Sequence, residues 1–275
     1  MDIKSVSCIY FSPTGTTGTI IKNIAKGMQS EQIEMMDCTS RSIREKDSFV
    51  FKNDLVILAT PVYYGRVPEE VVPFLKTLSV QNTPVVLAVV YGNREYEDAL
   101  IELHDISVEQ GFIPVAAGAF IAEHSYSNSS RPIAHARPDV DDIEAAQAFG
   151  SQIREKLKPI DSLEELEKIS VPGNIPYIEP ENLNMIKQVR NTLSFTPATD
   201  KDKCTQCNLC AEVCPTQAID SEDISQIDKW QCIICFACIK NCPTEAKQMT
   251  DPHFNGAIEQ LQIACQKRKE PEIYL

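Results

Sequence analysis

Eight of the eleven cysteines in this chain form two copies of one spacing. Each copy reads C-x-x-C-x-x-C-x-x-x-C and is followed by a proline. Three thiolates at positions i, i+3 and i+6 of a tight loop can hold three corners of one 4Fe–4S cubane, so the spacing is typical of iron–sulfur binding. The copies start at 204 and 232 and end in CPTQA and CPTEA, which indicates an internal duplication and predicts two clusters. The predicted ligands are Cys204, Cys207, Cys210 and Cys214, then Cys232, Cys235, Cys238 and Cys242.

Zinc is the alternative metal, because paired C-x-x-C units also bind zinc. A structural zinc ion takes four tetrahedral ligands, and neither copy is built as two separated pairs, so iron–sulfur clusters are favoured. Cys8, Cys38 and Cys265 lie outside the pattern. We interpret them as small buried apolar residues without a redox role.

A second candidate site follows the first apolar run, Ser5 to Phe11. Here Ser12-Pro13-Thr14-Gly15-Thr16-Thr17-Gly18 precedes a helical pattern. Hydroxyls and backbone N–H groups at the start of a helix form an anion cradle, aided by the helix dipole. The loop has neither the lysine of GxxxxGK[ST] nor a GxGxxG pattern, so it suits a monoester phosphate held by neutral donors. A plain turn with a Ser or Thr cap is the alternative. The predicted phosphate-binding residues are Ser12, Thr14, Gly15, Thr16 and Thr17.

Two tyrosine-bearing loops lie after later apolar runs. They read TPVYYGRVP from Thr60 and YGNREY from Tyr91. Exposed aromatic rings can stack on a flat heteroaromatic ring, and glycine lets the backbone approach its polar edge. Ordinary packing is the alternative for any one tyrosine. The predicted ring-binding residues are Pro61, Val62, Tyr63, Tyr64 and Gly65 in one loop, and Tyr91, Gly92, Asn93 and Tyr96 in the other.

Alternating strand-like and helix-like segments position these loops. Apolar runs predict strands at 5–11, 33–36, 55–59, 85–90 and 114–121, and helical periodicity follows 20–28, 68–78, 95–109 and 140–157. Strict alternation predicts an α/β fold with a doubly wound, parallel five-stranded sheet. Ligands of such sheets bind beyond the carboxyl ends of the strands, where the three loops lie. A further helix is expected from about His253 to Arg268, and one near 186–193.

The polar stretch from Glu123 to Arg137 follows the fifth predicted strand. Its position suggests a lid over the same ligand. His124 is the one candidate catalytic residue, as a hydrogen-bond donor or proton carrier. A histidine in a surface loop usually does neither, and that alternative stays open.

The three loops together resemble the FMN site of a flavodoxin-like domain. The PVYYGRVP segment is similar to the PxYxG loop of NAD(P)H-dependent FMN reductases and iron–sulfur flavoproteins. Short-chain flavodoxins often stack a tryptophan on the flavin, yet the only tryptophan here is Trp230, between the cysteine copies. The cysteine copies resemble bacterial two-cluster ferredoxins. That resemblance implies that the fourth cysteine of each copy binds the other cluster, so that Cys242 joins Cys204, Cys207 and Cys210, and Cys214 joins Cys232, Cys235 and Cys238.

As a whole the chain resembles flavodoxin–ferredoxin fusions. The resemblance implies a flavodoxin-like FMN-binding domain at 1–156, a connector at 157–200, a small α+β ferredoxin-like domain at 201–250, and a C-terminal helix and tail at 251–275. The implied cofactors are FMN and two 4Fe–4S clusters. The implied function is electron transfer between these groups and an external redox protein, which would be a ferredoxin, a flavodoxin or a reductase. The alternative is an FMN-dependent oxidoreductase whose clusters feed the flavin to reduce a small substrate, or accept electrons from NAD(P)H.

Charge and composition narrow the partners. The formal net charge is −13, and an acidic chain repels phosphate backbones and anionic lipids, so nucleic-acid and membrane partners are not expected. The first apolar run is too short for a signal peptide or a membrane span. Eleven cysteines without such a signal favour metal binding in the reducing cytoplasm over disulfides.

Overall fold

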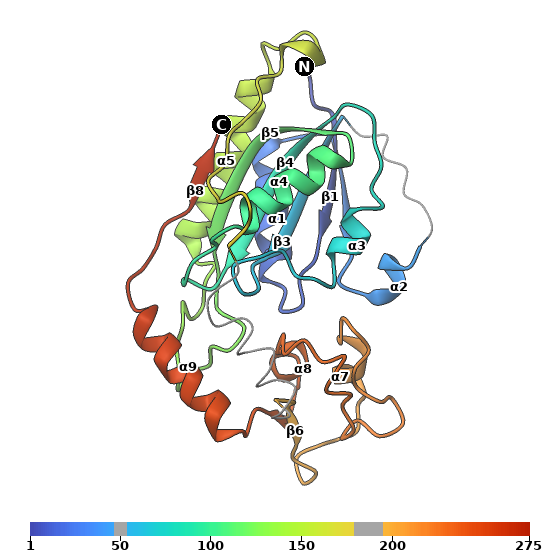
Figure 1. Ribbon diagram of the computed structural model, residues 1–275, viewed down its shortest axis with the longest axis vertical. Helices are drawn as coiled ribbons and strands as arrows, with labels where there is room; N and C mark the ends of the chain where they lie inside the picture. Colours follow the sequence, from blue (N-terminus) through green and yellow to red (C-terminus); the bar gives the residue numbers. More distant parts are fainter. Residues whose placement is uncertain (47–53, 179–194) are drawn as a thin grey trace.

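The computed structural model describes residues 1–46, 54–178 and 195–275. The helix expected near 186–193 lies outside these residues. A sheet flanked by helices forms one end of the molecule, and the cysteine-rich segment forms the other (Figure 1). Of the described helices, none is long and apolar enough to cross a membrane.

Five parallel strands confirm the predicted sheet. They are β1 (Ser5–Tyr10), β2 (Gln32–Asp37), β3 (Leu55–Pro61), β4 (Thr83–Tyr91) and β5 (Phe112–Ile121). The order β2-β1-β3-β4-β5 is that of flavodoxin-like sheets, whose topological switch point lies between β1 and β3. The predicted phosphate loop, Ser12 to Gly18, therefore leaves β1 at the place where such sheets bind ligands.

The C-terminal tail corrects the sequence interpretation. Instead of ending as a tail, the chain adds β8 (Glu272–Tyr274), antiparallel to β5, as a sixth strand. Tyr96 anchors this strand, since its hydroxyl donates to Glu272 Oε2 over 2.7 Å and lies 2.9 Å from the Tyr274 hydroxyl. A strand of three residues has no detectable apolar period, so only long-range pairing defines it.

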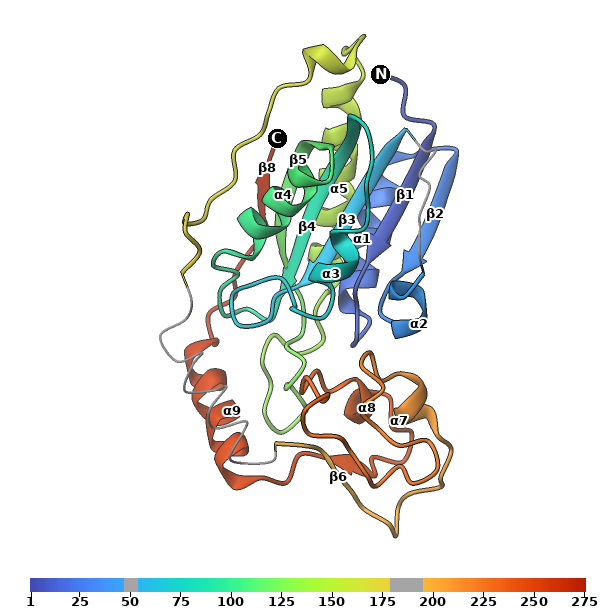
Figure 2. The same ribbon diagram turned by 45° about the vertical axis from the view of Figure 1, so that its right-hand side comes forward.

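Helices cover both faces of the sheet (Figure 2). The long helices α1 (Thr16–Met28) and α5 (Val140–Leu157) share one core with one face, and α3 (Val72–Leu75) and α4 (Ala99–Glu109) share another core with the opposite face. Glycine allows α1 and α5 to touch, because a Cβ at Gly150 would lie 2.0 Å from the Ile24 carbonyl oxygen. α3 is much shorter than the helix expected at 68–78, and the short α2 (Arg41–Arg44) was not expected.

The cysteine-rich unit repeats its backbone as well as its sequence. It contains α7 (Leu209–Glu212), α8 (Ala237–Lys240) and the antiparallel pair β6 (Ala198–Thr199) and β7 (Lys247–Gln248). Asn208 and Phe236 occupy equivalent places in the two copies, and both cap their helices with φ of 63°. The duplication therefore extends to the conformation of the loops.

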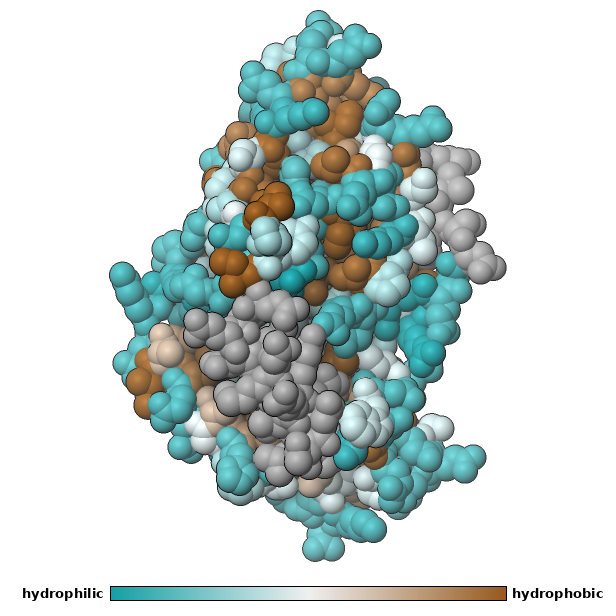
Figure 3. All heavy atoms as spheres, in the orientation of Figure 1, coloured by the Kyte–Doolittle hydropathy of each residue, from teal (hydrophilic) through white to brown (hydrophobic). Residues whose placement is uncertain are grey.

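Two segments join this unit to the sheet. On the way in, the described part of the connector contains the 3-10 turn η1 (Leu163–Glu165) and, at its end, β6. On the way out, α9 (Pro252–Ala264) begins at Asp251, whose side chain accepts from the His253 and Phe254 amides. It ends short of the predicted Arg268, and the chain then runs back to β8 (Figure 1). Hydrophilic side chains make up much of the face in Figure 3, as expected for an acidic chain.

Candidate cofactor site

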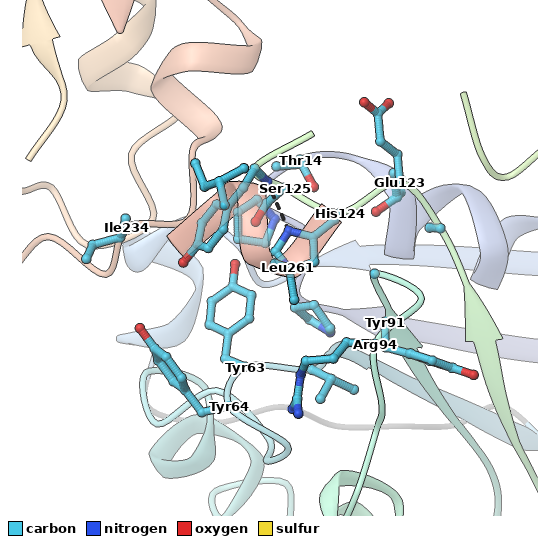
Figure 4. Close-up of a pocket in the computed structure, with 18 of the residues that line it drawn as sticks. Thr14, Tyr63, Tyr64, Tyr91, Arg94, Glu123, His124, Ser125, Ile234 and Leu261 are labelled. Atoms are coloured by element: carbon cyan, nitrogen blue, oxygen red, sulfur yellow. Dashed lines mark hydrogen bonds between the residues drawn. The ribbon is translucent and has the colours of Figure 1, made fainter. Parts of the chain in front are cut away.

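A cavity of about 680 Å³ lies where the carboxyl ends of the strands meet the cysteine-rich unit and α9. Three predicted loops and the segment after β5 supply part of its wall (Figure 4). The predicted residues that line it are Ser12, Thr14, Thr16, Thr17, Pro61, Val62, Tyr63, Tyr64, Tyr91, Gly92 and His124.

The phosphate loop is organised around Ser12. Its amide donates to Thr39 Oγ1 over 2.7 Å, and its hydroxyl accepts from the Gly18 amide over 3.0 Å. Gly15, with φ of 84°, turns the chain into α1 and contributes backbone rather than lining the cavity. The amides of Thr16 and Thr17 belong to the first helical turn and have no intrahelical acceptor. These N–H groups and the threonine hydroxyls on the cavity wall fit an anion such as a phosphate monoester.

The first tyrosine loop is a tight turn held by α4. Tyr63 and Arg66 exchange backbone hydrogen bonds of 3.0 Å, while Tyr64 and Gly65 adopt positive φ values of 54° and 76°. Arg66 donates twice to Glu102, each over 2.8 Å. Gly65 does not line the cavity, because the side on which a Cβ would stand faces Glu97. The turn presents Tyr63 and Tyr64 to the cavity from a rigid base.

His124 packs against the second loop. A Cβ at Gly92 would lie 2.3 Å from His124 Cδ2, so only glycine fits beside this ring. The Nδ1 atom accepts from the Tyr126 amide over 3.1 Å (Figure 4). Burial, together with the nearby charges of Arg94 and Lys240, lowers the pKa of His124 to about 4. The ring is therefore neutral at pH 7, and with Nδ1 accepting, the proton lies on Nε2.

Asn93 and Tyr96 are not among the residues that line the cavity, and their side chains contact the C-terminal segment. Asn93 donates to the carbonyls of Cys265 and Lys267 over 2.8 Å and accepts from the Lys269 amide. Tyr96 binds β8, as described above. Both side chains connect the loop after β4 to the C-terminal segment.

The eight predicted ligands line two separate hollows in the cysteine-rich unit. Cys204, Cys207, Cys210 and Cys242 line what we term the first hollow. Cys214, Cys232, Cys235 and Cys238 line the second hollow. This grouping is the crossed one that the ferredoxin resemblance implies. Four cysteines around each hollow match the number of ligands that a 4Fe–4S cluster takes.

The three remaining cysteines are buried among the described residues. Burial raises the pKa of Cys8 and of Cys38 to about 12, so both stay protonated and unreactive at neutral pH.

Sequence reasoning missed the wall that the C-terminal half contributes to the cavity. Ile233 and Ile234 line it, although they lie between the ligands Cys232 and Cys235. α9 adds apolar residues, including Phe254 and Leu261. No local pattern marks these residues as cavity-lining, because their periodicity equally fits an ordinary helix face.

The second hollow lies next to the cavity. The ring of Tyr126 packs at a tilt against that of Phe236, the residue that follows Cys235, with ring centroids 4.6 Å apart. The pKa of Tyr63 is raised well above its ordinary value, first by burial and then by the proximity of Cys235. Lys240 of α8 also connects the cysteine-rich unit to the segment after β5. Its ammonium donates to Glu123 over 2.9 Å and to the Ser127 carbonyl over 2.7 Å.

Comparison with protein families agrees with this arrangement. A family model of the flavodoxin domain matches residues 8–105, and one of the 4Fe-4S dicluster domain matches residues 196–243. The chain is thus a fusion of an N-terminal flavodoxin domain and a C-terminal ferredoxin-like domain. This pair of domains indicates flavin-linked iron–sulfur electron transfer.

Several solved structures are similar to the N-terminal part. A flavodoxin from the domain Archaea shares 14% identity over 56% of this chain and 99% of its own, with a TM-score of 0.40. Flavodoxin 2 from Bacillus cereus shares 16% identity over 55% of this chain and 99% of its own, with a TM-score of 0.42. Rubredoxin oxygen:oxidoreductase from Desulfovibrio gigas shares 16% identity over 57% of this chain and 36% of its own, with a TM-score of 0.41. A search of curated proteins found no match.

Proposed function

We propose that this protein is an electron-transfer iron–sulfur flavoprotein with one FMN and two 4Fe–4S clusters. The proposal is supported most directly by the wall that the cavity shares with the second hollow. Ile233 and Ile234 belong to the loop between two cluster ligands and also line the cavity that the phosphate loop enters. Electron transfer slows steeply with distance, so a direct contact between the two sites suits electron exchange.

Three groups of residues would hold FMN. Thr14, Thr16 and Thr17, with the first amides of α1, would bind the phosphate. The turn at Tyr63 and Tyr64 and the loop at Gly92 would contact the ring. When bound, FMN supplies one- and two-electron chemistry, which joins the one-electron clusters to two-electron reactions.

The two hollows suggest a direction for the electron path. The second hollow is next to the cavity, with Cys235 and Cys238 buried. The first hollow is further out, and its Cys207 is exposed. We expect an external redox protein, of the ferredoxin, flavodoxin or reductase type, to exchange electrons with the outer cluster. Reduced thiols favour a cytoplasmic location.

Cofactor content and reduction kinetics test the proposal. Anaerobically prepared protein should hold roughly eight irons per chain, as two 4Fe–4S clusters require, and one FMN. Stopped-flow mixing with reduced ferredoxin, NADH and NADPH in parallel then identifies the donor. Rapid bleaching with ferredoxin alone supports the carrier function, whereas bound zinc or the absence of flavin would overturn the proposal.

Two features of the cavity favour the second function, an FMN-dependent oxidoreductase. The apolar wall from α9 and the neutral His124 ring give the cavity the features of a substrate site. Replacing His124 with alanine should lower turnover of a small substrate if the protein is an enzyme. If the protein only carries electrons, the substitution should leave reduction by ferredoxin unchanged.

A further inference from the structure

Lys247 is one of the largest fully buried side chains, with 2% of its surface exposed. It stands in β7, opposite Thr199 of β6. Its ammonium donates to Thr199 Oγ1 over 2.8 Å and to the Ile224 carbonyl, both of which are neutral acceptors. Across residues 1–46, 54–178 and 195–275, no carboxylate pairs with it. A buried ammonium without a counter-charge is strongly unfavourable, so this position calls for an anion.

The first hollow lies beside this ammonium. Lys247, Thr199 and Ile224 line it together with Cys204, Cys207, Cys210 and Cys242. The two acceptors account for two of the three N–H groups of the lysine. A 4Fe–4S cluster with four thiolate ligands is anionic, and one-electron reduction makes it more so. The group that the hollow suits would therefore be the missing counter-charge.

The internal duplication supplies a natural comparison. Twenty-eight residues before Lys247, the first copy has Ile219, in CPTQAI against CPTEAK. Ile219 lines the second hollow, just as Lys247 lines the first. Two hollows built by one repeated segment thus differ at this position by a full buried charge.

We propose that Lys247 is a positioning residue that raises the reduction potential of the cluster in the first hollow and thereby makes the two clusters unequal. The inference rests on the proposed function, since it presupposes a cluster in each hollow. A fixed positive charge stabilises the more negative, reduced state, and net charge is one of the main determinants of cluster potentials. The electron comes from the external one-electron donor, and no proton or bond change is involved.

The position of Lys247 also sets the relative size of its effect on the two clusters. Lys247 is among the residues that line the first hollow and is not among those that line the second. Since the interaction between charges weakens with distance, we expect a large effect on the first cluster and a smaller one on the second.

An EPR-monitored redox titration of the cofactor-loaded protein tests this. Replacing Lys247 with methionine keeps the length of the side chain and removes the charge. We expect the reduced-to-oxidised ratio of one cluster at fixed potential to fall at least tenfold, a downward shift of about 59 mV for one electron. Lys247→Arg should keep the midpoint close to the original.

Two further variants serve as controls. Lys203→Met removes an exposed charge next to Cys204 and should change the ratio less than threefold. Ile219→Lys places the charge in the second hollow and should raise the midpoint of the other cluster. Unchanged midpoints in Lys247→Met with both clusters present would overturn the proposal.

Loss of a cluster is also decisive. If Lys247→Met loses a cluster that Lys247→Arg retains, the charge is required, which supports the proposal. If both variants lose it, the position serves packing and the proposal is wrong. Failure of the proposed function is distinguishable, because it would show as missing iron or flavin in the unaltered protein.

Discussion

At the scale of single residues, His124 shows how packing changes a side chain's chemistry. The sequence suggested a lid histidine that donates a hydrogen bond or carries a proton, with an ordinary surface histidine as the alternative. In the structure its ring lies against Gly92 and Tyr126, and burial lowers its pKa to about 4. A neutral ring at physiological pH can donate from Nε2 but cannot supply positive charge.

The pKa of His124 predicts a pH-dependent stability. Because the folded value lies below the unfolded value of about 6.5, the unfolded chain binds the extra proton. The contribution of His124 to the free energy of unfolding is therefore fully present above pH 6.5 and is lost as the pH falls toward 4. Between pH 7.5 and 5.5 we expect the free energy of unfolding to fall by about 1 kcal/mol less in His124→Asn than in the unaltered protein. Denaturation midpoints at both pH values measure this, and an identical pH dependence in the two proteins would contradict it.

Gly92 is the second residue-scale test. Its alanine variant must displace the His124 ring, because the added Cβ would lie 2.3 Å from it. Displacing a wall of the cavity should weaken FMN binding at least tenfold, or about 1.4 kcal/mol. Fluorescence titration of flavin measures this. The matched control is Gly256→Ala in α9, where nothing lies within 4 Å of the new Cβ and affinity should not change. Equal affinities in both variants would remove Gly92 from the site.

At the scale of elements, the start of α1 shows how a loop and a helix combine into one wall of the cavity. Gly15 reverses the chain, Ser12 caps the first turn from within the loop, and the threonines face the cavity. The guanidinium of Arg94, which also lines the cavity, is paired with Glu97. A phosphate at this loop would therefore be held by the neutral hydroxyl and N–H donors.

We therefore predict that Thr16→Val weakens FMN binding. A hydrogen bond to a charged group contributes about 1.5–3 kcal/mol, or roughly tenfold to hundredfold in affinity. Iron content should not change. Thr19→Val is the control, because the Thr19 hydroxyl bonds the Gly15 carbonyl within α1 and does not line the cavity. Flavin titrations in which the two variants bind equally well would refute the phosphate assignment.

At the scale of the whole molecule, the C-terminal segment holds the two units together. After α9 it returns to the sheet, where β8 pairs with β5 and Asn93 binds its backbone at three points. Arg44 makes a separate link, donating to the Pro215 carbonyl over 2.6 Å. The cavity between the units depends on these contacts.

Asn93→Ala should loosen this attachment. One buried carbonyl, one partly buried carbonyl and one partly buried amide lose their partners, each at a cost of about 1–3 kcal/mol before water compensates. We expect a lower denaturation midpoint and faster hydrogen exchange in α9 and β8. Asn128→Ala, in an exposed loop with only local hydrogen bonds, is the control. If exchange in α9 were unchanged in Asn93→Ala, the segment would be held mainly by β8.

Local patterns in the sequence were sufficient to predict the strand–helix alternation, the turn from β1 into α1 and the spacing of the cysteines. Each of these depends on residues within about one turn or one strand of each other, so their periods are visible in the chain. Tertiary structure decided the rest: the pairing of β8, the attachment of Asn93 and Tyr96 to the C-terminal segment, and the burial of Lys247. It also brought Ile233 and Ile234 against loops of the sheet. Such contacts join residues up to 178 positions apart, as between Tyr96 and Tyr274. They arise from packing between whole elements, which leaves no local period in the sequence.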